Sequence, residues 1–399
     1  MIIVSTDEMA VYIDLGSRQE TGCDIDNIYN LSEEESEEYG YNDGQTALLV
    51  VILPVFLILG VIGNLAFIYV VLRITHMQTI TNRYLISLAV ADIIFLCSAV
   101  GHKLAKYAMS PIQVDDTPLG TFGCVWIYFL TDTAYFSSLF CVTLVSVDRY
   151  MAVCCPQNRK SIIKSKSLEI IFLSWIASAF LAACLTPGNA DQKVHCVQWP
   201  DVKQYKTWPK VVRICSPLRH QIWISSVSTG LQTVPFFVTL VMNIVLYISI
   251  IKGLDKCIRR LSQHGVQTNA DTGIRNQIAK MLVVNGLVFF CLLFPFEINC
   301  VFSMIATFRT EDNAQNFLIS SETVRQYILI LAQLCSYINS AVNPVVYTVM
   351  CRRYRQAFKK VFLPDKCMNK TSNRLSNSCR TGDIHFETMH QAANNETAV

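Results

Sequence analysis

The chain has 399 residues and a formal net charge of +3, with 52% hydrophobic and only 16% charged residues. A soluble domain has about a quarter of its residues charged, so this composition argues against an ordinary soluble globular protein. The charges stand in short clusters between long apolar runs, which is typical of an integral membrane protein.

Seven apolar runs within residues 46–351 are long enough to cross a bilayer, whose core takes roughly 20 residues of helix. A buried core helix of a soluble protein explains one short run but not seven long ones in succession. Continuous apolarity also excludes the alternating strands of a membrane β-barrel. The sequence predicts an all-α membrane protein, a seven-transmembrane helix bundle with spans at about 47–72, 84–107, 122–150, 168–188, 222–251, 279–306 and 324–350.

Lys and Arg are concentrated in the loops after the third and fifth spans and in the segment after the seventh. Cytoplasmic loops carry an excess of basic residues. Residues 1–45, in contrast, contain many acids and a single basic residue, Arg18. We therefore expect a multi-pass plasma-membrane protein with an extracellular N-terminus and a cytoplasmic C-terminus.

Residues 1–45 are polar and acidic without helical periodicity, so we expect an extracellular disordered segment. Tyr39 and Tyr41 lie among carboxylates, in a stretch that is either a solvated acidic tail or an electrostatic collector for a basic ligand. Sulfation of these tyrosines is a hypothesis. Asn30 begins an Asn-Leu-Ser acceptor for N-glycosylation.

After the seventh span, residues 352–363 place Tyr354, Phe358 and Phe362 four apart, with basic residues opposite. This pattern predicts a short amphipathic helix on the anionic lipid of the inner leaflet. Cys367 is a candidate for palmitoylation, and a free cytosolic thiol is the alternative. Residues 364–399 are expected to be a disordered cytoplasmic tail, whose end at Thr397-Ala398-Val399 has a form that PDZ domains bind.

Polar side chains within the spans mark functional positions, because they are costly in a bilayer unless they are partnered. A carboxylate in the second span, a hydroxyl in the third and three amide or hydroxyl groups in the seventh could form a site for a hard cation such as sodium. The alternative is a dry hydrogen-bond network between helices. These residues are Asp92, Ser138, Asn339, Ser340 and Asn343.

An ordered set of motifs runs through the spans with consistent spacing. The set comprises Gly63-Asn64, Leu88-Ala89-Val90-Ala91-Asp92, Asp148-Arg149-Tyr150, Trp175, Phe289 with Pro295, and Asn343-Pro344-Val345-Val346-Tyr347. Together these motifs resemble the rhodopsin-like G-protein-coupled receptors over about residues 46–363.

The resemblance implies a switch at the cytoplasmic side. Arg149 would pair with Asp148 at rest in a surface-near ion pair of modest strength. On activation it would be released to meet a heterotrimeric G protein, with Tyr347 moving inward beside it. Arrestin is a further implied partner. The other residues implied in activation are Tyr150, Phe289, Leu293, Pro295, Asn343 and Pro344.

The five polar residues of the spans coincide with the family's sodium pocket, in which sodium would be an allosteric modulator that favours the inactive state. No other cofactor is expected. The resemblance also implies a disulfide from Cys124 to the second outer loop, which offers Cys196 and Cys215. The Cys-x-x-x-Trp-Pro stretch at Cys196 is similar to the hairpin of peptide receptors, so we expect Cys124–Cys196. A second bridge between Cys23 and Cys215 is a hypothesis.

Two small-ligand classes fit poorly. Thr131 stands where amine receptors have an aspartate, and Tyr337 stands where opsins have the lysine that holds retinal. The acidic N-terminus and the long second outer loop, residues 188–220, favour a peptide. Residues 75–92 and 337–360 look most like the thyrotropin-releasing-hormone and neuromedin receptor group, whereas the second outer loop looks like the somatostatin and allatostatin-C group.

Candidate ligand-binding residues face the cavity from the outer halves of the helices: Thr131, Asp132, Tyr135, Gln232, Phe296, Glu297, Gln333 and Tyr337. Asp132 and Glu297 would pair with a basic group of the ligand. The alternatives are that the two carboxylates share a proton, or that they pair with Arg325 or Lys103.

Two positions depart from the family pattern. Leu293 replaces the tryptophan at the floor of the ligand pocket, so we expect a deeper cavity and no aromatic switch there. Pro235 lies twelve residues before Tyr247 instead of about eight. Either Asn243 replaces the usual tyrosine, or the helix alignment is shifted by one turn.

The sequence thus predicts a G-protein-coupled receptor for an extracellular peptide. One alternative is a scavenger or decoy receptor of the same fold, which Leu293 favours and the intact Asp148–Tyr150 and Asn343–Tyr347 motifs oppose. Another is a receptor for a small non-peptide ligand. A transporter would show inverted repeats, and an enzyme would show spaced His/Cys or Ser/His/Asp sets. The sequence has neither pattern, and no nucleic-acid partner is expected.

Overall fold

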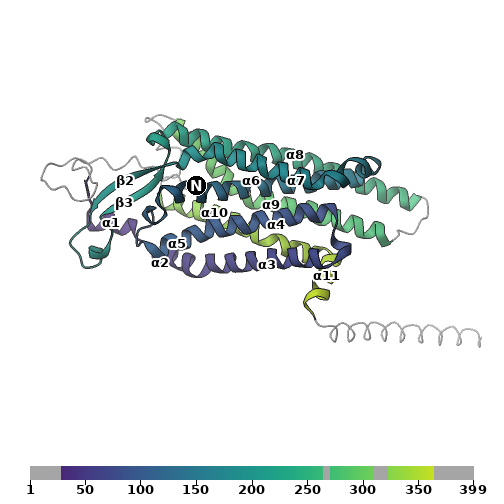
Figure 1. The fold of residues 1–399 in the computed structure, drawn as a ribbon, viewed down its shortest axis with the longest axis horizontal. Helices are drawn as coiled ribbons and strands as arrows, with labels where there is room; N and C mark the ends of the chain where they lie inside the picture. The colour runs from purple at the N-terminus through teal and green to yellow at the C-terminus, as the bar shows by residue number, and fades with distance from the viewer. Residues whose placement is uncertain (1–27, 264–269, 309–321, 364–399) are drawn as a thin grey trace, which may run out of the picture.

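The computed structural model describes residues 28–263, 270–308 and 322–363. Within these ranges, seven long membrane-spanning helical segments lie side by side along the longest axis, with a small sheet at one end (Figure 1). The predicted seven-helix bundle is confirmed. The bundle consists of α3 (Leu53–Arg73), α4 (Ile80–Phe95) continued through a π-helical turn into α5 (Gly101–Met109), α6 (Gly120–Cys154), α7 (Pro156–Leu185), α8 (Ile222–Gln263), α9 (Ala270–Phe308) and α10 (Glu322–Met350).

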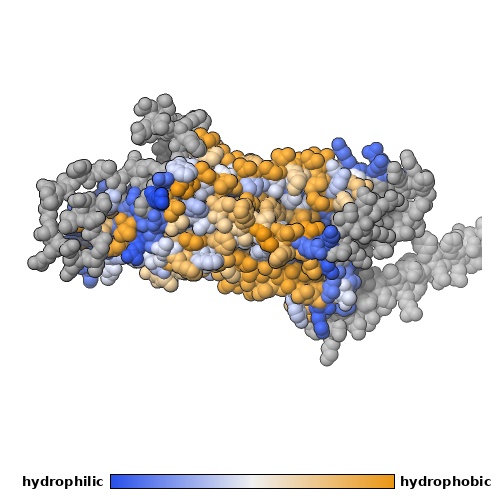
Figure 2. All heavy atoms as spheres, turned by 45° about the horizontal axis from the view of Figure 1, so that its top comes forward, coloured by the Kyte–Doolittle hydropathy of each residue, from blue (hydrophilic) through white to orange (hydrophobic). Residues whose placement is uncertain are grey.

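The middle of the bundle presents apolar side chains outward. Figure 2 shows hydrophobic residues over the central part and hydrophilic residues towards both ends. On α8, a stripe of valines three or four residues apart has about 60% of each side chain exposed: Val234, Val238, Val241 and Val245. Soluble proteins rarely expose contiguous apolar surface of this kind. Lipid tails accept it, and a helix satisfies its own backbone hydrogen bonds within the bilayer.

The N-terminal segment differs from the expectation. From residue 28 it has regular structure, with β1 (Ile28–Asn30), α1 (Glu33–Tyr39) and α2 (Asp43–Ala47). Ser32 and Asn42 cap the two helices, and each forms a reciprocal capping box with the residue three positions on. The prediction of a disordered segment is therefore wrong for residues 28–45, and residues 1–27 lie outside the described part.

The sheet at the end of the bundle contains β1, β2 (Asp191–Gln198) and β3 (Val211–Ser216) in the order β1-β2-β3. The strands β2 and β3 form an antiparallel hairpin, and β1 lies parallel to β2 with Ile28 opposite Cys196. We call this end of the bundle the sheet end. The opposite end, where α11 (Arg352–Phe362) lies, is the α11 end (Figure 1).

The disulfide from α6 reaches a different cysteine from the one predicted. Cys124 is bonded to Cys215, with 5.7 Å between their Cα atoms. The predicted Cys124–Cys196 bridge is wrong, and so is the Cys23–Cys215 hypothesis. Cys196 is also disulfide-bonded, to a cysteine whose side chain lies outside the described part.

The register of the hairpin explains this pairing. Cys215 lies opposite Gln192, and the Gln192 amide donates a hydrogen bond of 3.4 Å to Cys124 Sγ. Cys196 lies four residues farther along β2, which is about 13 Å at roughly 3.3 Å per residue. The hairpin end that rests on α6 therefore brings Cys215, and not Cys196, to Cys124.

The predicted amphipathic helix is α11. Its Phe362 is 54% exposed, whereas Tyr354 is buried against Phe67 and Tyr347. The Tyr354 hydroxyl donates a hydrogen bond to Asn82 Oδ1. One face of α11 is thus anchored to the bundle, and four basic residues are exposed on it: Arg352, Arg355, Lys359 and Lys360. Cys367 and the tail from residue 364 lie outside the described residues.

Candidate functional site

Glu297 is a fully buried carboxylate in the half of α9 nearest the sheet end. Tyr135 of α6 donates a hydrogen bond of 2.5 Å to its Oε1 atom. The buried hydroxyl of Thr233 on α8 lies within reach of the same carboxylate. The three helices α6, α8 and α9 therefore converge on one buried carboxylate.

Asp132 lies one turn of α6 before Tyr135 and is close enough to Glu297 for their charges to interact. Lys103 neutralises neither carboxylate. Its ammonium donates to Gln333 Oε1 and lies 6.0 Å from the ring centroid of Tyr337. The alternative of a pairing with Lys103 is therefore wrong, and the Arg325 side chain lies outside the described part.

The other predicted pocket residues lie on α6, α8, α9 and α10. The Thr131 hydroxyl is hydrogen-bonded to Ser98 at 2.8 Å. Gln232 is buried on α8 and Phe296 is half-buried on α9. The structure brings Tyr135 to Glu297, and it brings Gln333 and Tyr337 to Lys103. Thr233 and Ser98 were not predicted, because a single hydroxyl in an apolar run gives only a weak signal.

Leu293 lies one turn of α9 from Glu297 and is buried. The cavity beside it, which Phe95, Tyr135 and Phe289 also line, has a volume of only about 10 Å³. That volume holds about one water molecule. Leu293 therefore does not leave the deeper cavity that was expected beside it.

Near the middle of the bundle, the five predicted polar residues converge on Asp92, which is fully buried. Asn343 donates a hydrogen bond of 2.7 Å to Asp92 Oδ2, and Ser138 donates one of 3.3 Å to Oδ1. Ser340 also contacts this carboxylate. Asn339 Oδ1 is buried without a hydrogen-bond partner in the described residues. One carboxylate with hydroxyl and amide oxygens suits a hard cation, so these residues fit sodium.

At the α11 end, Arg149 forms the predicted ion pair with Asp148, at 2.7 Å. Thr81 of α4 donates a second hydrogen bond to the same carboxylate oxygen, at 2.6 Å. The side chains of Arg149 and Asp148 are only 10% and 1% exposed, so the pair is buried and not near the surface as expected. Removing one partner of a buried pair costs more than breaking an exposed pair.

Tyr247 of α8 lies beside this ion pair. Ser146, one turn before Arg149, donates a hydrogen bond of 3.2 Å to the Tyr247 hydroxyl. The Asn243 amide instead donates a hydrogen bond of 2.9 Å to the Thr143 hydroxyl, which lies one turn farther into the bundle. The structure therefore supports the alternative in which α8 is shifted by one turn and Tyr247 keeps the usual place of the tyrosine.

The remaining residues implied in activation lie on α6, α9 and α10. Phe289 and Tyr347 are buried, and the Tyr347 ring lies 5.1 Å from that of Phe67. Tyr150 packs against the cluster that contains Tyr247. Pro295 and Pro344 lie inside α9 and α10, where each removes a backbone donor.

A family model described as "7 transmembrane receptor (rhodopsin family)" matches residues 63–347. The mouse thyrotropin-releasing hormone receptor is 26% identical over 360 residues, which cover 83% of this chain and 81% of the relative. The mouse neuromedin-U receptor 2 is 28% identical, covering 79% and 75%. The rat somatostatin receptor type 5 is 27% identical, covering 80% and 78%.

The family match spans more than half of the chain and contains both the Asp92 cluster and the Asp148–Arg149 pair. The relatives are signalling receptors and not enzymes. The chain belongs to the rhodopsin family of seven-transmembrane receptors.

Proposed function

We propose that this protein is a plasma-membrane receptor that an extracellular peptide activates and that transmits activation to a heterotrimeric G protein. The observation that carries the proposal is the arrangement of one bundle with a charged site at each end. Glu297 is a buried carboxylate in the half of the bundle nearest the sheet end, and Arg149 is held in a closed ion pair at the α11 end.

Two observations support a peptide as the ligand. The relatives reported above are named for thyrotropin-releasing hormone, neuromedin-U and somatostatin. The buried Glu297 and neighbouring Asp132 offer two carboxylates close to each other, which suits a basic side chain or a terminal amine of a peptide. Such a charge-assisted contact is stronger than a neutral hydrogen bond.

We propose that the sheet end faces outward and the α11 end faces the cytoplasm. The exposed basic residues of α11 suit an anionic inner leaflet, and α1 at the other end carries exposed glutamates. Asn30 is exposed on β1 at the sheet end, so this orientation keeps it accessible for N-glycosylation.

The proposed mechanism follows the polar contacts of α9. A cation bound at Glu297 would change the contact of this helix with Tyr135, and Pro295, two residues away, is a point at which α9 bends easily. Movement of the cytoplasmic half of α9 would uncover Tyr247 and Arg149, which the G protein then contacts. The buried Asp148–Arg149 pair stabilises the resting state until the G protein binds.

We propose that sodium binds at Asp92 with Ser138, Asn339, Ser340 and Asn343 in the resting state. Bound sodium would neutralise the buried carboxylate. Agonist and sodium would then weaken each other's binding by the same factor, since allosteric coupling is reciprocal.

Further partners follow from the same orientation. We propose arrestin as a cytoplasmic partner, a PDZ domain at Thr397-Ala398-Val399, and membrane anchoring by palmitoylated Cys367. The last two lie outside the described residues, so they rest on the sequence alone.

The test is a screen of the full-length receptor in transfected cells against amidated and disulfide-closed neuropeptides, with calcium and cyclic-AMP readouts. At least one peptide is expected to activate a G-protein pathway in receptor cells and not in mock-transfected cells. Ligand-driven internalisation with no G-protein signal in any readout would contradict the proposal.

A further inference from the structure

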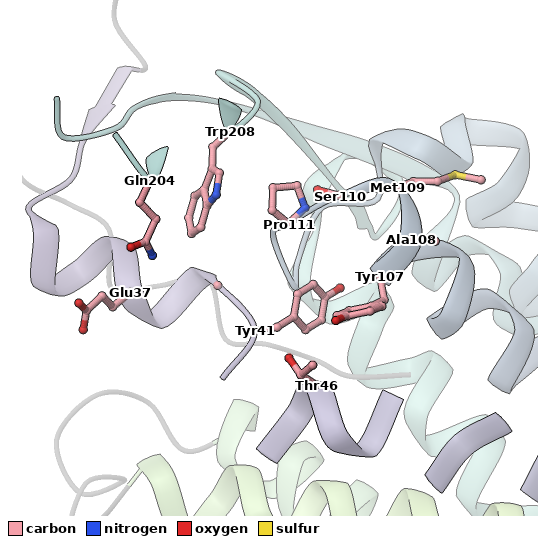
Figure 3. A pocket seen from close by; sticks show the side chains of 11 residues that line it. Glu37, Tyr41, Thr46, Tyr107, Ala108, Met109, Ser110, Pro111, Gln204 and Trp208 are labelled. Atoms are coloured by element: carbon pink, nitrogen blue, oxygen red, sulfur yellow. The ribbon is translucent and has the colours of Figure 1, made fainter. Parts of the chain in front are cut away.

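A second cavity lies at the sheet end, outside the membrane-spanning part. Its volume is about 700 Å³, which is within the size range of ligand pockets. The N-terminal segment, the end of α5 and the loop between β2 and β3 form its walls. Figure 3 shows Trp208 and Gln204 extending from the loop on one side, with Tyr41, Tyr107 and Thr46 on the other. We call it the outer pocket.

The outer pocket is built by contacts that fix the N-terminal segment. Gln113 donates its backbone N–H to Tyr39 O at 3.0 Å and its side-chain amide to Gly40 O. Its Oε1 atom accepts a hydrogen bond of 2.8 Å from Gln45 Nε2. Three contacts of one residue thus hold the turn between α1 and α2 over the loop that follows α5.

Aromatic side chains hold the wall that the β2–β3 loop forms. Trp208 packs edge-on against Trp199 and Tyr205, with ring centroids 4.9 and 4.8 Å apart. Trp199 also packs against Tyr39 of α1, and its Nε1 donates a hydrogen bond of 2.9 Å to Pro209 O. This aromatic cluster joins the N-terminal segment to the loop, so the outer pocket is preformed.

The lining of the outer pocket suits a cation. Three aromatic residues line it, namely Tyr41, Tyr107 and Trp208, and Glu37 stands at its edge. None of its described lining residues is basic. Aromatic faces attract cations, with tryptophan the strongest. Burial and the nearby charge of Asp115 raise the pKa of Tyr41 to about 12, so its phenol stays neutral and remains a hydrogen-bond donor.

The outer pocket lies close to the residues proposed to bind the ligand within the bundle. Tyr107 lies one turn of α5 from Lys103, about 6 Å along the helix axis. Tyr41, Tyr107 and Tyr337 belong to one hydrophobic cluster. A peptide of a few residues is long enough to reach both places.

We propose that the outer pocket binds a cationic segment of the peptide ligand, with an arginine or lysine side chain against Trp208 and Tyr41 and near the Glu37 carboxylate. This inference rests on the proposed function, because it assigns a second contact to the same peptide. The outer pocket lies beyond the residues predicted for the membrane cavity and depends on the N-terminal segment.

The test uses defined probes and needs no agonist. The full-length receptor in lipid nanodiscs is mixed with N-acetylated tripeptide amides Gly-Arg-Gly, Gly-Lys-Gly, Gly-Leu-Gly and Gly-Glu-Gly, and binding is measured by saturation-transfer NMR. The Arg and Lys peptides are expected to give signals at least twofold above those of the Leu and Glu peptides. Glu37→Gln and Trp208→Ala are each expected to lower the Arg signal at least twofold.

Matched controls separate this site from others. Glu38→Gln removes a charge from the same helix outside the pocket lining, and Trp223→Ala removes an exposed tryptophan at the start of α8. Both should leave the Arg signal unchanged. Trp208→Ala also removes packing, so Trp208→Phe, which keeps an aromatic ring, should restore most of the signal. Glu37 is exposed, so Glu37→Gln removes the charge without a packing defect.

Three outcomes would overturn the inference. The first is equal signals from all four peptides. The second is a signal lost in Glu297→Gln but kept in Glu37→Gln and Trp208→Ala, which would place the cation in the membrane cavity. The third is an Arg signal that arises only after residues 1–22 are deleted, which would mean that the chain's own N-terminus fills the pocket. None of these outcomes affects the G-protein screen, so the two proposals can fail separately.

Discussion

At the scale of single residues, the informative feature is which side chains partner the buried carboxylates. Asp92 is hydrogen-bonded through both oxygens, and Asp148 accepts bonds from Arg149 and Thr81. Glu297 accepts a hydrogen bond from Tyr135 and lies within reach of Thr233. The sequence indicates all three positions, because carboxylates in or beside apolar spans are costly. Only the structure shows which helices supply their partners.

Glu297→Gln is expected to lower agonist potency at least tenfold, about 1.4 kcal/mol, because the amide keeps the size of the side chain but loses the charge. Concentration–response curves for the agonist found in the peptide screen measure this effect, with cell-surface expression held equal. Glu169→Gln, an exposed glutamate on α7, is the matched control. Unchanged potency would remove Glu297 from the ligand site.

Asp92→Asn is expected to abolish the effect of sodium on agonist affinity, because it removes the only carboxylate of the proposed sodium site. In the wild-type receptor, replacing sodium by potassium at equal ionic strength should raise agonist affinity by at least fivefold, within the usual range of allosteric coupling. Radioligand binding in the two salts measures this. Asp201→Asn, an exposed aspartate in the β2–β3 loop, should keep the wild-type sodium response; an Asp92→Asn receptor that also keeps it would exclude this site.

At the scale of elements, the contact between α8 and α9 depends on a glycine. A Cβ atom at Gly286 would lie 1.7 Å from the Tyr247 hydroxyl oxygen. The absent side chain is what lets Tyr247 lie between α6 and α9.

Gly286→Ala is therefore expected to destabilise the resting receptor by about 1–3 kcal/mol through overpacking. The measurement is the thermal midpoint of the purified receptor in detergent. Gly101→Ala is the control, because a Cβ at Gly101 would meet nothing within 4 Å. Adding Tyr247→Leu should recover part of the loss; equal midpoints for Gly286→Ala and wild type would contradict the packing described here.

The disulfide provides a second prediction at this scale. Mass spectrometry of a non-reduced digest should recover a peptide pair that joins Cys124 to Cys215. The hairpin register of β2 and β3 requires this pairing. A Cys124–Cys196 pair would show that the hairpin is shifted along α6, and the fragment containing Cys196 would identify its partner directly.

The elements differ in how far the sequence predicts them. Membrane helices are predicted well, because a long apolar run has few alternatives. The N-terminal helices were missed because their composition is acidic, although the capping boxes at Ser32 and Asn42 are visible as Ser-x-x-Glu and Asn-x-x-Gln. The disulfide was predicted wrongly, because strand register is set by long-range contacts such as that of Gln192 with Cys124.

At the scale of the whole molecule, the two ends of one bundle are specialised in different ways. The sheet end combines a structured N-terminal segment and a disulfide-anchored hairpin with the two contacts proposed for the ligand. The α11 end holds Arg149 in a buried pair and anchors α11 through Tyr354. Composition and motif spacing predicted this division, whereas the outer pocket depends on how separate segments meet and could not be read from any one of them.

The central claim is that binding at the sheet end releases Arg149 to a G protein at the α11 end. Its most direct test is GTP exchange on purified heterotrimeric G proteins by the receptor in nanodiscs, with and without the agonist from the screen. We expect agonist to raise the exchange rate at least tenfold in the wild type and to have no effect in Arg149→Ala, although both bind the agonist. Agonist-driven exchange that is equal in the two receptors, or absent from both, would contradict the account.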